Sequence, residues 1–148
     1  MPPYSHRRDD TVPEFSDQGS IVFMDGNCAM CSRSSRIIAR LDRRDEFLIC
    51  TTQSPLGQAV LRHYGLEPAN PDSWLYLESG LPYTSLDAIA RVGVRLGGLA
   101  RLLGVLSWPP RSVQDWFYSL IARNRYRIMG QADLCALPDA RVRKRLIG

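Results

Sequence analysis

The spacing of apolar residues changes along this chain, and each spacing predicts a different element. Continuous apolar runs at residues 21–24 and 47–51 are typical of strands that are buried on both faces. Between these runs, apolar and small residues recur at helical spacing opposite a row of arginines, which predicts an amphipathic helix. The positions that we expect on its inward face are Met30, Ser34, Ile37, Ile38 and Leu41.

The middle of the chain carries clear boundary signals. A Ser-Pro pair at residues 54–55 predicts the N-cap and first position of a short helix, and Gly65 is well placed to end it. The apolar run at 74–77, the turn dipeptide at 79–80 and a short strand at 81–84 predict an antiparallel hairpin.

Beyond the hairpin the pattern is helical. A helix that Ser85 would cap ends at the glycine pair 97–98, a second segment ends at the proline pair 109–110, and a longer amphipathic helix follows. Four large residues of the longer helix are interpreted as core: Trp116, Phe117, Leu120 and Ile121. A short, strongly basic helix is predicted over residues 139–146.

Two cysteines, Cys28 and Cys31, lie where the first strand passes into the first helix. Backbone N–H groups and the dipole at a helix N-terminus favour the thiolate form of Cys28, and a thiolate is the species that attacks a disulfide. Cys31 lies one turn further in, so we expect it to be more shielded and to resolve the mixed disulfide. The spacing therefore favours a redox pair, with half of a metal site as the main alternative.

The order of these elements predicts the fold class. A β-α-β start, a CxxC at its first turn and a closing antiparallel hairpin indicate an α/β protein with a thioredoxin-like βαβαββα core and a helical C-terminal extension. Residues 1–19 lack periodicity and are rich in Pro, Ser, Asp and Arg, so they are predicted to be a disordered N-terminal tail. Residues 20–148 are predicted to form the single domain.

The overall composition indicates the class of protein and the cellular location to expect. The chain has 148 residues, of which 45% are hydrophobic and 23% charged, as in ordinary soluble globular proteins. Its first twenty residues lack the apolar stretch of a secretory signal, and its most apolar region is too often interrupted by arginine and glycine to span a membrane. We therefore expect a cytoplasmic, reducing location without stable membrane insertion, where a CxxC pair is more often catalytic or metal-binding than structural.

Two other residues bear on the chemistry of the pair. Asp25 ends the first strand three residues before Cys28, and its carboxylate is a candidate catalytic group that could accept a proton from the resolving thiol. Capping of the loop and helix start by the same carboxylate is an alternative and compatible role. Cys50 lies within a buried strand pattern and is interpreted as a core residue.

A zinc site is the alternative use of the cysteines. The pair together with Cys50 and Cys135 would supply four thiolates, but structural zinc sites usually combine two close-spaced pairs and this chain has one. Neither His6 nor His63 lies beside another ligand type at metal spacing. No metal or cofactor is therefore predicted.

Basic residues gather toward the C-terminus: Arg123, Arg125, Arg127, Arg141, Arg143, Lys144 and Arg145. We interpret them as a solvated face or as partners of Asp133 and Asp139. No nucleic-acid motif accompanies them, so no nucleic acid is expected as a partner. They leave open an alternative function, a non-catalytic binding module with a basic C-terminal face for an acidic or membrane-associated partner and a redox-sensitive or metal-binding CxxC.

The motif at residues 25–31, Asp-Gly-Asn-Cys-Ala-Met-Cys, is the first of an ordered set. The others are Ser54 in a Gln-Ser turn, Tyr83-Thr84-Ser85, Leu96-Gly97-Gly98, Asn124-Arg125-Tyr126-Arg127 followed by Gly130, and Cys135-Ala136-Leu137-Pro138. This set resembles the DCC family of predicted thiol-disulfide oxidoreductases, which is named for the trio found here as Asp25, Cys28 and Cys31. The similarity runs from Ile21 to Ile147.

The resemblance implies a thioredoxin-like fold and a redox function. It also places a cysteine at Cys135, which leaves a third thiol near the pair as an alternative to plain packing. Better-known thioredoxins carry a cis-proline before the strand beside the active site. Here Ser73 takes the nearest position and Pro71 lies two residues earlier, so we expect the substrate-gripping loop to differ.

These observations together predict a thiol-disulfide oxidoreductase of the protein-disulfide reductase type. Cys28 would be the nucleophile, Cys31 the resolving thiol and Asp25 the assisting carboxylate. The substrate would be a disulfide-containing protein or a small thiol compound, and an unidentified electron donor would restore the pair.

Overall fold

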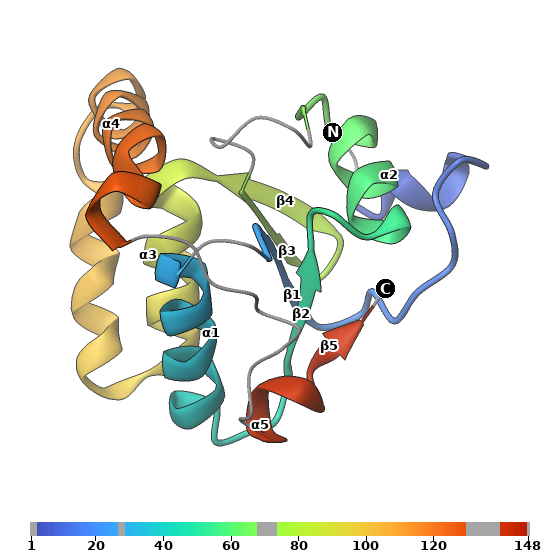
Figure 1. Ribbon diagram of the computed structural model, residues 1–148, viewed down its shortest axis with the longest axis horizontal. Helices are drawn as coiled ribbons and strands as arrows, with labels where there is room; N and C mark the ends of the chain where they lie inside the picture. The colour runs from blue at the N-terminus through green and yellow to red at the C-terminus, as the bar shows by residue number, and fades with distance from the viewer. Residues whose placement is uncertain (1–2, 27–28, 68–73, 130–139, 148) are drawn as a thin grey trace.

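A five-stranded mixed sheet runs through the middle of the molecule, with helices on both of its faces (Figure 1). The computed structural model describes residues 3–26, 29–67, 74–129 and 140–147. The strands are β1 (Ser20–Met24), β2 (Phe47–Thr51), β3 (Leu75–Glu78), β4 (Leu81–Thr84) and β5 (Leu146–Ile147), in the order β4-β3-β1-β2-β5. β1 is central, because it pairs parallel with β2 and antiparallel with β3.

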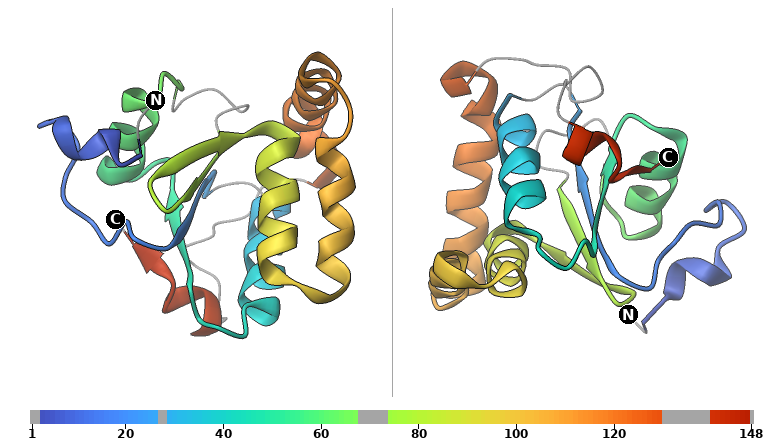
Figure 2. Two further views of the ribbon diagram at one scale, coloured as in Figure 1. Left: turned by 180° about the vertical axis from the view of Figure 1, so that it is seen from behind. Right: turned by 90° about the horizontal axis from the view of Figure 1, so that it is seen from below.

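The helices complete the predicted order. They are η1 (Ser5–Arg8), α1 (Ala29–Leu41), α2 (Pro55–His63), α3 (Ser85–Leu96), η2 (Gly98–Ser107), α4 (Arg111–Met129) and α5 (Ala140–Arg143), where η1 and η2 are 3-10 helices. The run from β1 to α3 is β-α-β-α-β-β-α, which confirms the thioredoxin-like core. η2, α4 and α5 form the predicted helical extension, and η2 lies beside α3 (Figure 2).

Alternation along β1 separates two cores, one on each face of the sheet. Val22 and Met24 pack toward α1 and α3, whereas Ile21 and Phe23 pack toward α2. All four side chains are fully buried, as the continuous apolar run predicts. β1 is therefore held from both sides, and this fixes the point at which it leads toward α1.

Two of the predicted boundary signals act as expected, whereas α3 begins at Ser85 with Thr84 and not Ser85 as its N-cap. The Ser54 hydroxyl caps α2 by accepting the Gly57 N–H at 3.0 Å, and Gly65 follows the helix with φ of +76°. The hairpin turn between β3 and β4 places Ser79 and Gly80 at φ of +48° and +79°. Positive φ at both central residues is the pattern of a two-residue type I′ hairpin.

The inward face of α1 differs from the predicted one. Ile37 and Leu41 are nearly half exposed, while the buried positions are Cys31, Ser32, Ser35, Ile38, Ala39 and, just after the helix, Asp42. Ser35 and Ala39 on the buried face are small, and the Ser35 hydroxyl donates to the carbonyls of Cys31 and Ser32 at 2.9 Å. The inward face of α1 therefore includes small and hydroxyl-bearing residues in place of the larger Ile37 and Leu41.

The N-terminal segment packs against α2, in contrast to the predicted disordered tail. His6 is buried and hydrogen-bonded through both ring nitrogens, at 2.7 Å to Asp17 and 2.8 Å to the Tyr64 hydroxyl. His63 likewise contacts Ser5 at 2.9 Å and Asp9 at 2.8 Å. Long-range polar contacts of this kind leave no periodic signal in the sequence.

We expect acid to release this N-terminal segment. Hydrogen bonds from Thr11 and His63 lower the pKa of Asp9 to about 2, and the Arg7 side chain lowers the pKa of Asp17. A carboxyl group whose pKa is lower in the folded than in the unfolded protein stabilises the folded state at pH values above its unfolded-state pKa. This contribution is lost as the pH falls through the folded-state pKa. The protection factors of the amides in residues 3–17, corrected for the intrinsic exchange rate at each pH, should therefore fall between about pH 4 and pH 2 before those of the sheet do.

The variant Asp17→Asn provides the control for the acid experiment. It removes the partner of both His6 and Arg7, so exchange in the segment should be faster at neutral pH and depend less on acid. Equal protection of the segment at pH 7 and pH 3 would contradict the expectation.

The C-terminus adds an edge strand that sequence patterns did not predict. The predicted basic helix over 139–146 is shorter, since α5 ends at Arg143 and β5 then pairs parallel with β2. Arg145 is buried and contacts Asp42 at 3.2 Å and Asp45 at 2.7 Å. This ion pair ties the chain end to the turn between α1 and β2.

The α4 side chains interpreted as core are exposed, which corrects that prediction. Trp116, Phe117, Leu120 and Ile121 are each between 42% and 58% exposed. Helical periodicity identifies an apolar face but not whether another element covers it.

In the portions of the chain that are described, no helix has the length and hydropathy of a membrane span.

Candidate functional site

Cys31 lies in the first turn of α1, directly after the central strand. Its side chain is 8% exposed and belongs to the core between the sheet, α1 and α3. Cys31 is thus shielded from solvent, while its predicted difference in exposure from Cys28 stays a prediction. Cys28, the predicted nucleophile, lies outside the described residues, and its role stays a prediction.

Asp25 is held at the end of β1 by a side chain from the neighbouring loop. Gln53 follows β2, and its Nε2 donates to Asp25 Oδ1 at 2.6 Å while its Oε1 accepts the Gly26 N–H at 2.9 Å. Asp25 is 6% exposed, so this contact is shielded from water. The donor and the acceptor of the Gln53 side-chain amide therefore bridge the two loops at the carboxyl ends of β1 and β2.

Gly26 permits this close approach. A Cβ at position 26 would come within 3.1 Å of both Gln53 Oε1 and Thr51 Cγ2. Glycine avoids that crowding, so the Asp-Gly pair brings its backbone against the second loop.

An apolar cavity of about 250 Å³ borders Cys31. Its walls come from α1, α3, η2 and α4, and Trp74 closes part of it from the start of β3. Leu86 of α3 and Tyr118 and Ile121 of α4 are among the lining residues. The cavity can therefore hold an apolar group beside the second cysteine of the pair.

A second and larger cleft, of about 670 Å³, lies between the C-terminal ends of α1 and α3. It is lined by charges of both signs, and Arg95 donates to Glu46 at 2.9 and 3.2 Å across it. Neither Asp25 nor Cys31, the two candidates that the structure describes, lines this cleft. Of these two cavities, only the smaller, apolar one is lined by Cys31.

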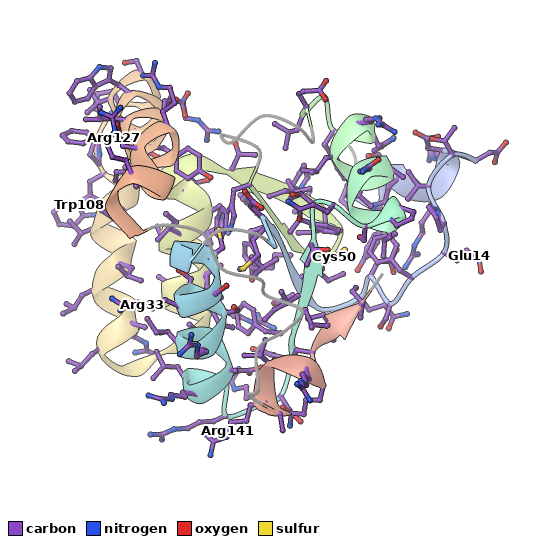
Figure 3. All side chains as sticks on the ribbon, in the orientation of Figure 1. Glu14, Arg33, Cys50, Trp108, Arg127 and Arg141 are labelled. Carbon is purple, nitrogen blue, oxygen red and sulfur yellow. The ribbon has the colours of Figure 1, made fainter. Side chains whose placement is uncertain are left out.

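Cys50 is a core residue, as predicted. It is fully buried on β2 beside α2, with its sulfur 3.3 Å from the Ser54 hydroxyl (Figure 3). Burial raises the pKa of the Cys50 thiol, which keeps it protonated and unreactive at neutral pH.

Several predicted positions fall outside the described residues. They are Cys28, Pro71, Ser73, Asp133, Cys135 and Asp139. The cis-proline question and the third thiol therefore stay as sequence-based expectations.

The sequence of this chain matches the model of a known protein family. The family model described as DCC1-like thiol-disulfide oxidoreductase matches residues 22–131, which include Asp25, Cys28 and Cys31. The chain belongs to this family. The match confirms the resemblance found in the sequence motifs, and it ends before α5 and β5.

Two relatives extend the match of this DCC1-like chain. It is 32% identical over 127 residues to the uncharacterized protein YuxK of Bacillus subtilis, covering 86% of this chain and 93% of that protein. It is 28% identical over 122 residues to a chloroplastic DCC family protein of Arabidopsis thaliana, covering 82% of this chain and 71% of that one. No solved structure gives a significant match.

One site residue of this DCC1-like chain was missed by sequence reasoning. Gln53 appears in the sequence only as part of a Gln-Ser turn, and its contact with Asp25 depends on the register of β1 against β2. His6 and His63, considered as metal ligands, instead fasten the N-terminal segment. Within the described ranges, no three His, Cys, Asp or Glu side chains converge as metal ligands would.

Proposed function

We propose that this DCC1-like protein exchanges dithiols and disulfides through Cys28 and Cys31, in the direction of disulfide reduction. The observation that supports this most strongly is the position of Cys31, recessed in the first helical turn after the central strand. A resolving thiol needs such shielding, because it should react with the neighbouring sulfur rather than with solvent species.

The proposed cycle balances two electrons. The Cys28 thiolate attacks one sulfur of the substrate disulfide, forms a mixed disulfide and displaces the other sulfur as a thiolate. The Cys31 thiolate then attacks the Cys28 sulfur and releases the remaining substrate thiolate. Cys28 and Cys31 end as a disulfide, which an external dithiol donor reduces again.

In this proposal Asp25 receives the proton that Cys31 loses when it becomes the attacking thiolate. The Gln53 amide holds the carboxylate at the strand end, and the low exposure of Asp25 limits competing proton exchange with water. Asp25 would thus assist the second step and not the first.

The variant Asp25→Ala tests that assignment. If the carboxylate accepts the proton, resolution of the mixed disulfide slows while thermal stability changes little. If it acts only as a cap, stability falls by about 0.5–2 kcal/mol and the chemistry stays near normal. Stopped-flow measurement of the two thiol steps separates these results, and Gln53→Ala, which keeps the carboxylate, should slow resolution less than Asp25→Ala.

The apolar cavity beside Cys31 supports a substrate with an apolar group near its disulfide. Its lining is mostly apolar and has few hydrogen-bonding groups, so it suits a leucine or phenylalanine side chain of a protein substrate. This favours a protein disulfide over a small, highly charged thiol compound.

Equilibration in glutathione buffers tests the redox proposal. Thiol alkylation and mass measurement should show one two-electron transition that converts Cys28 and Cys31 together, at a potential between about −270 and −180 mV. Cys50 serves as an internal control, because its burial should keep it out of the exchange. A pair that never forms its disulfide across the buffer range would contradict the proposal.

The alternative of a non-catalytic binding module is favoured by one observation, the exposed apolar residues of α4. Under that alternative, the double variant Cys28→Ser/Cys31→Ser would retain the full biological activity of the protein. The basic C-terminal face would not act as one patch, since Arg127 and Arg141 lie far apart, near the top and the bottom of the view in Figure 3.

A further inference from the structure

The apolar stripe of α4 faces away from the body of the protein. Val113, Trp116, Phe117 and Leu120 follow the i, i+3, i+4, i+7 spacing of one helix face, and each is at least 40% exposed. Gln114, on the other side of the helix, is 5% exposed and donates to the Pro109 carbonyl at 2.8 Å. α4 is thus an amphipathic helix with its apolar side toward the solvent.

A second apolar row lies on η2. Residues three apart eclipse one another in a 3-10 helix, and Leu99, Leu102 and Val105 follow that spacing. Trp108, the residue directly after η2, continues it. All four are more than half exposed, and Leu99 and Trp108 exceed 80%. We call the eight residues of the two rows the η2–α4 surface, and both elements lie on the side of the molecule farthest from α2 (Figure 1).

This concentration is specific to one segment. Of the thirteen large apolar residues that are exposed among those described, ten lie in residues 98–129. An exposed set of this size on a soluble domain generally marks an interaction surface.

The same segment contains the entire charge excess of the chain. Residues 98–129 have five arginines and one aspartate, a net charge of +4, which equals the net charge of the whole protein. The other basic and acidic residues of the chain balance. Arg123 and Arg127 follow Trp116 by seven and eleven residues, so they lie on the same side of α4 as the apolar stripe, and both are exposed.

We propose that the η2–α4 surface docks this protein on the surface of an anionic lipid bilayer. Tryptophan, leucine and phenylalanine beside arginines are the composition of helices that lie in the membrane interface. The apolar side chains protrude as rows from two helices, which a fluid lipid layer can accommodate. A second copy of the chain would bring two segments of charge +4 together, and their repulsion disfavours that occupant.

Docking places the redox site close to the bilayer. Tyr118 and Ile121 of α4 line the cavity beside Cys31, so one helix contributes to both the cavity and the docking surface. The docking proposal does not depend on the redox cycle and applies equally to a protein without catalytic activity.

Vesicle sedimentation of the full chain tests the proposal. The protein should bind vesicles of phosphatidylglycerol and phosphatidylcholine, bind pure phosphatidylcholine vesicles far more weakly, and lose binding as salt is raised. Brominated lipid should quench tryptophan fluorescence in the bound state, because Trp108 and Trp116 would enter the interface.

Paired variants separate the apolar from the electrostatic contribution. Trp116→Ser/Phe117→Ser should weaken partition by about tenfold or more, since two large apolar side chains no longer leave water. Arg123→Gln/Arg127→Gln should weaken it by about fivefold per arginine. Arg141→Gln/Arg143→Gln, the matched control on α5, removes the same charge far from the surface and should have little effect.

Three outcomes would overturn the proposal. The first is absence of binding to the anionic vesicles. The second is equal binding to neutral vesicles or equal weakening by the α5 control, which would exclude the assigned surface. The third is a concentration-dependent dimer that Trp116→Ser/Phe117→Ser abolishes without any vesicle binding, which would assign the surface to a second copy of the chain. All variants change exposed residues, and circular dichroism should confirm that each folds.

Discussion

Cys31→Ser should accumulate a mixed disulfide with its substrate or with glutathione, whereas Cys28→Ser should form none. The expected effect is complete in both cases, since turnover falls to the background of uncatalysed exchange. Cys31 is 8% exposed and lies within the core, so it cannot replace Cys28 as the attacking thiol without movement of α1. Non-reducing mass spectrometry of each variant after exposure to oxidised glutathione measures the adduct.

The conservative variant Cys50→Ala provides the control for the cysteine pair. It removes a buried thiol from the opposite core and should leave the full cycle intact. Equal adduct formation by Cys28→Ser and Cys31→Ser, or by neither, would exclude the dithiol mechanism and leave the binding module as the better account.

Asp42→Asn should destabilise the protein by about 3 kcal/mol or more, the largest expected effect on folding. Asp42 and Arg145 form an ion pair whose side chains are only 2% and 5% exposed, and Asp42 also accepts the N–H groups of Glu46 and Phe47. The variant leaves the positive charge of Arg145 buried without the negative charge of Asp42 beside it. Urea unfolding followed by circular dichroism measures the change in the free energy of unfolding.

The matched control for this prediction is Asp45→Asn. Asp45 also contacts Arg145, at 2.7 Å, but its side chain is 61% exposed, so water screens the loss of its charge. The stability of this variant should change much less than that of Asp42→Asn. Equal destabilisation by the two variants would show that burial of the pair is not what makes it important.

The described part of the candidate site was largely predictable, because its signals are local. Cys31 follows an apolar strand at a helix start, and both the strand and the helix form as predicted. Gln53 could not be predicted in the same way, since its contact with Asp25 joins residues 28 positions apart. That contact exists only because β1 and β2 pair in parallel register.

Elements whose signals lie within a few residues of one another could be predicted from the sequence alone. The apolar run of β1, the Ser-Pro start of α2 and the positive-φ turn at Ser79 each act through local sterics and hydrogen bonds. Their order was sufficient to predict the thioredoxin-like core, because short connections and right-handed crossovers leave few arrangements.

Which apolar faces are covered depends on how the whole chain packs. Helical periodicity correctly predicted α1 and α4. However, the buried face of α1 includes small residues that the pattern did not single out, and no described element covers the apolar stripe of α4. Contacts between distant residues likewise determined the packing of His6 and the two-residue strand β5. Local sequence sets the conformation of a segment, whereas burial depends on what the rest of the chain brings against it.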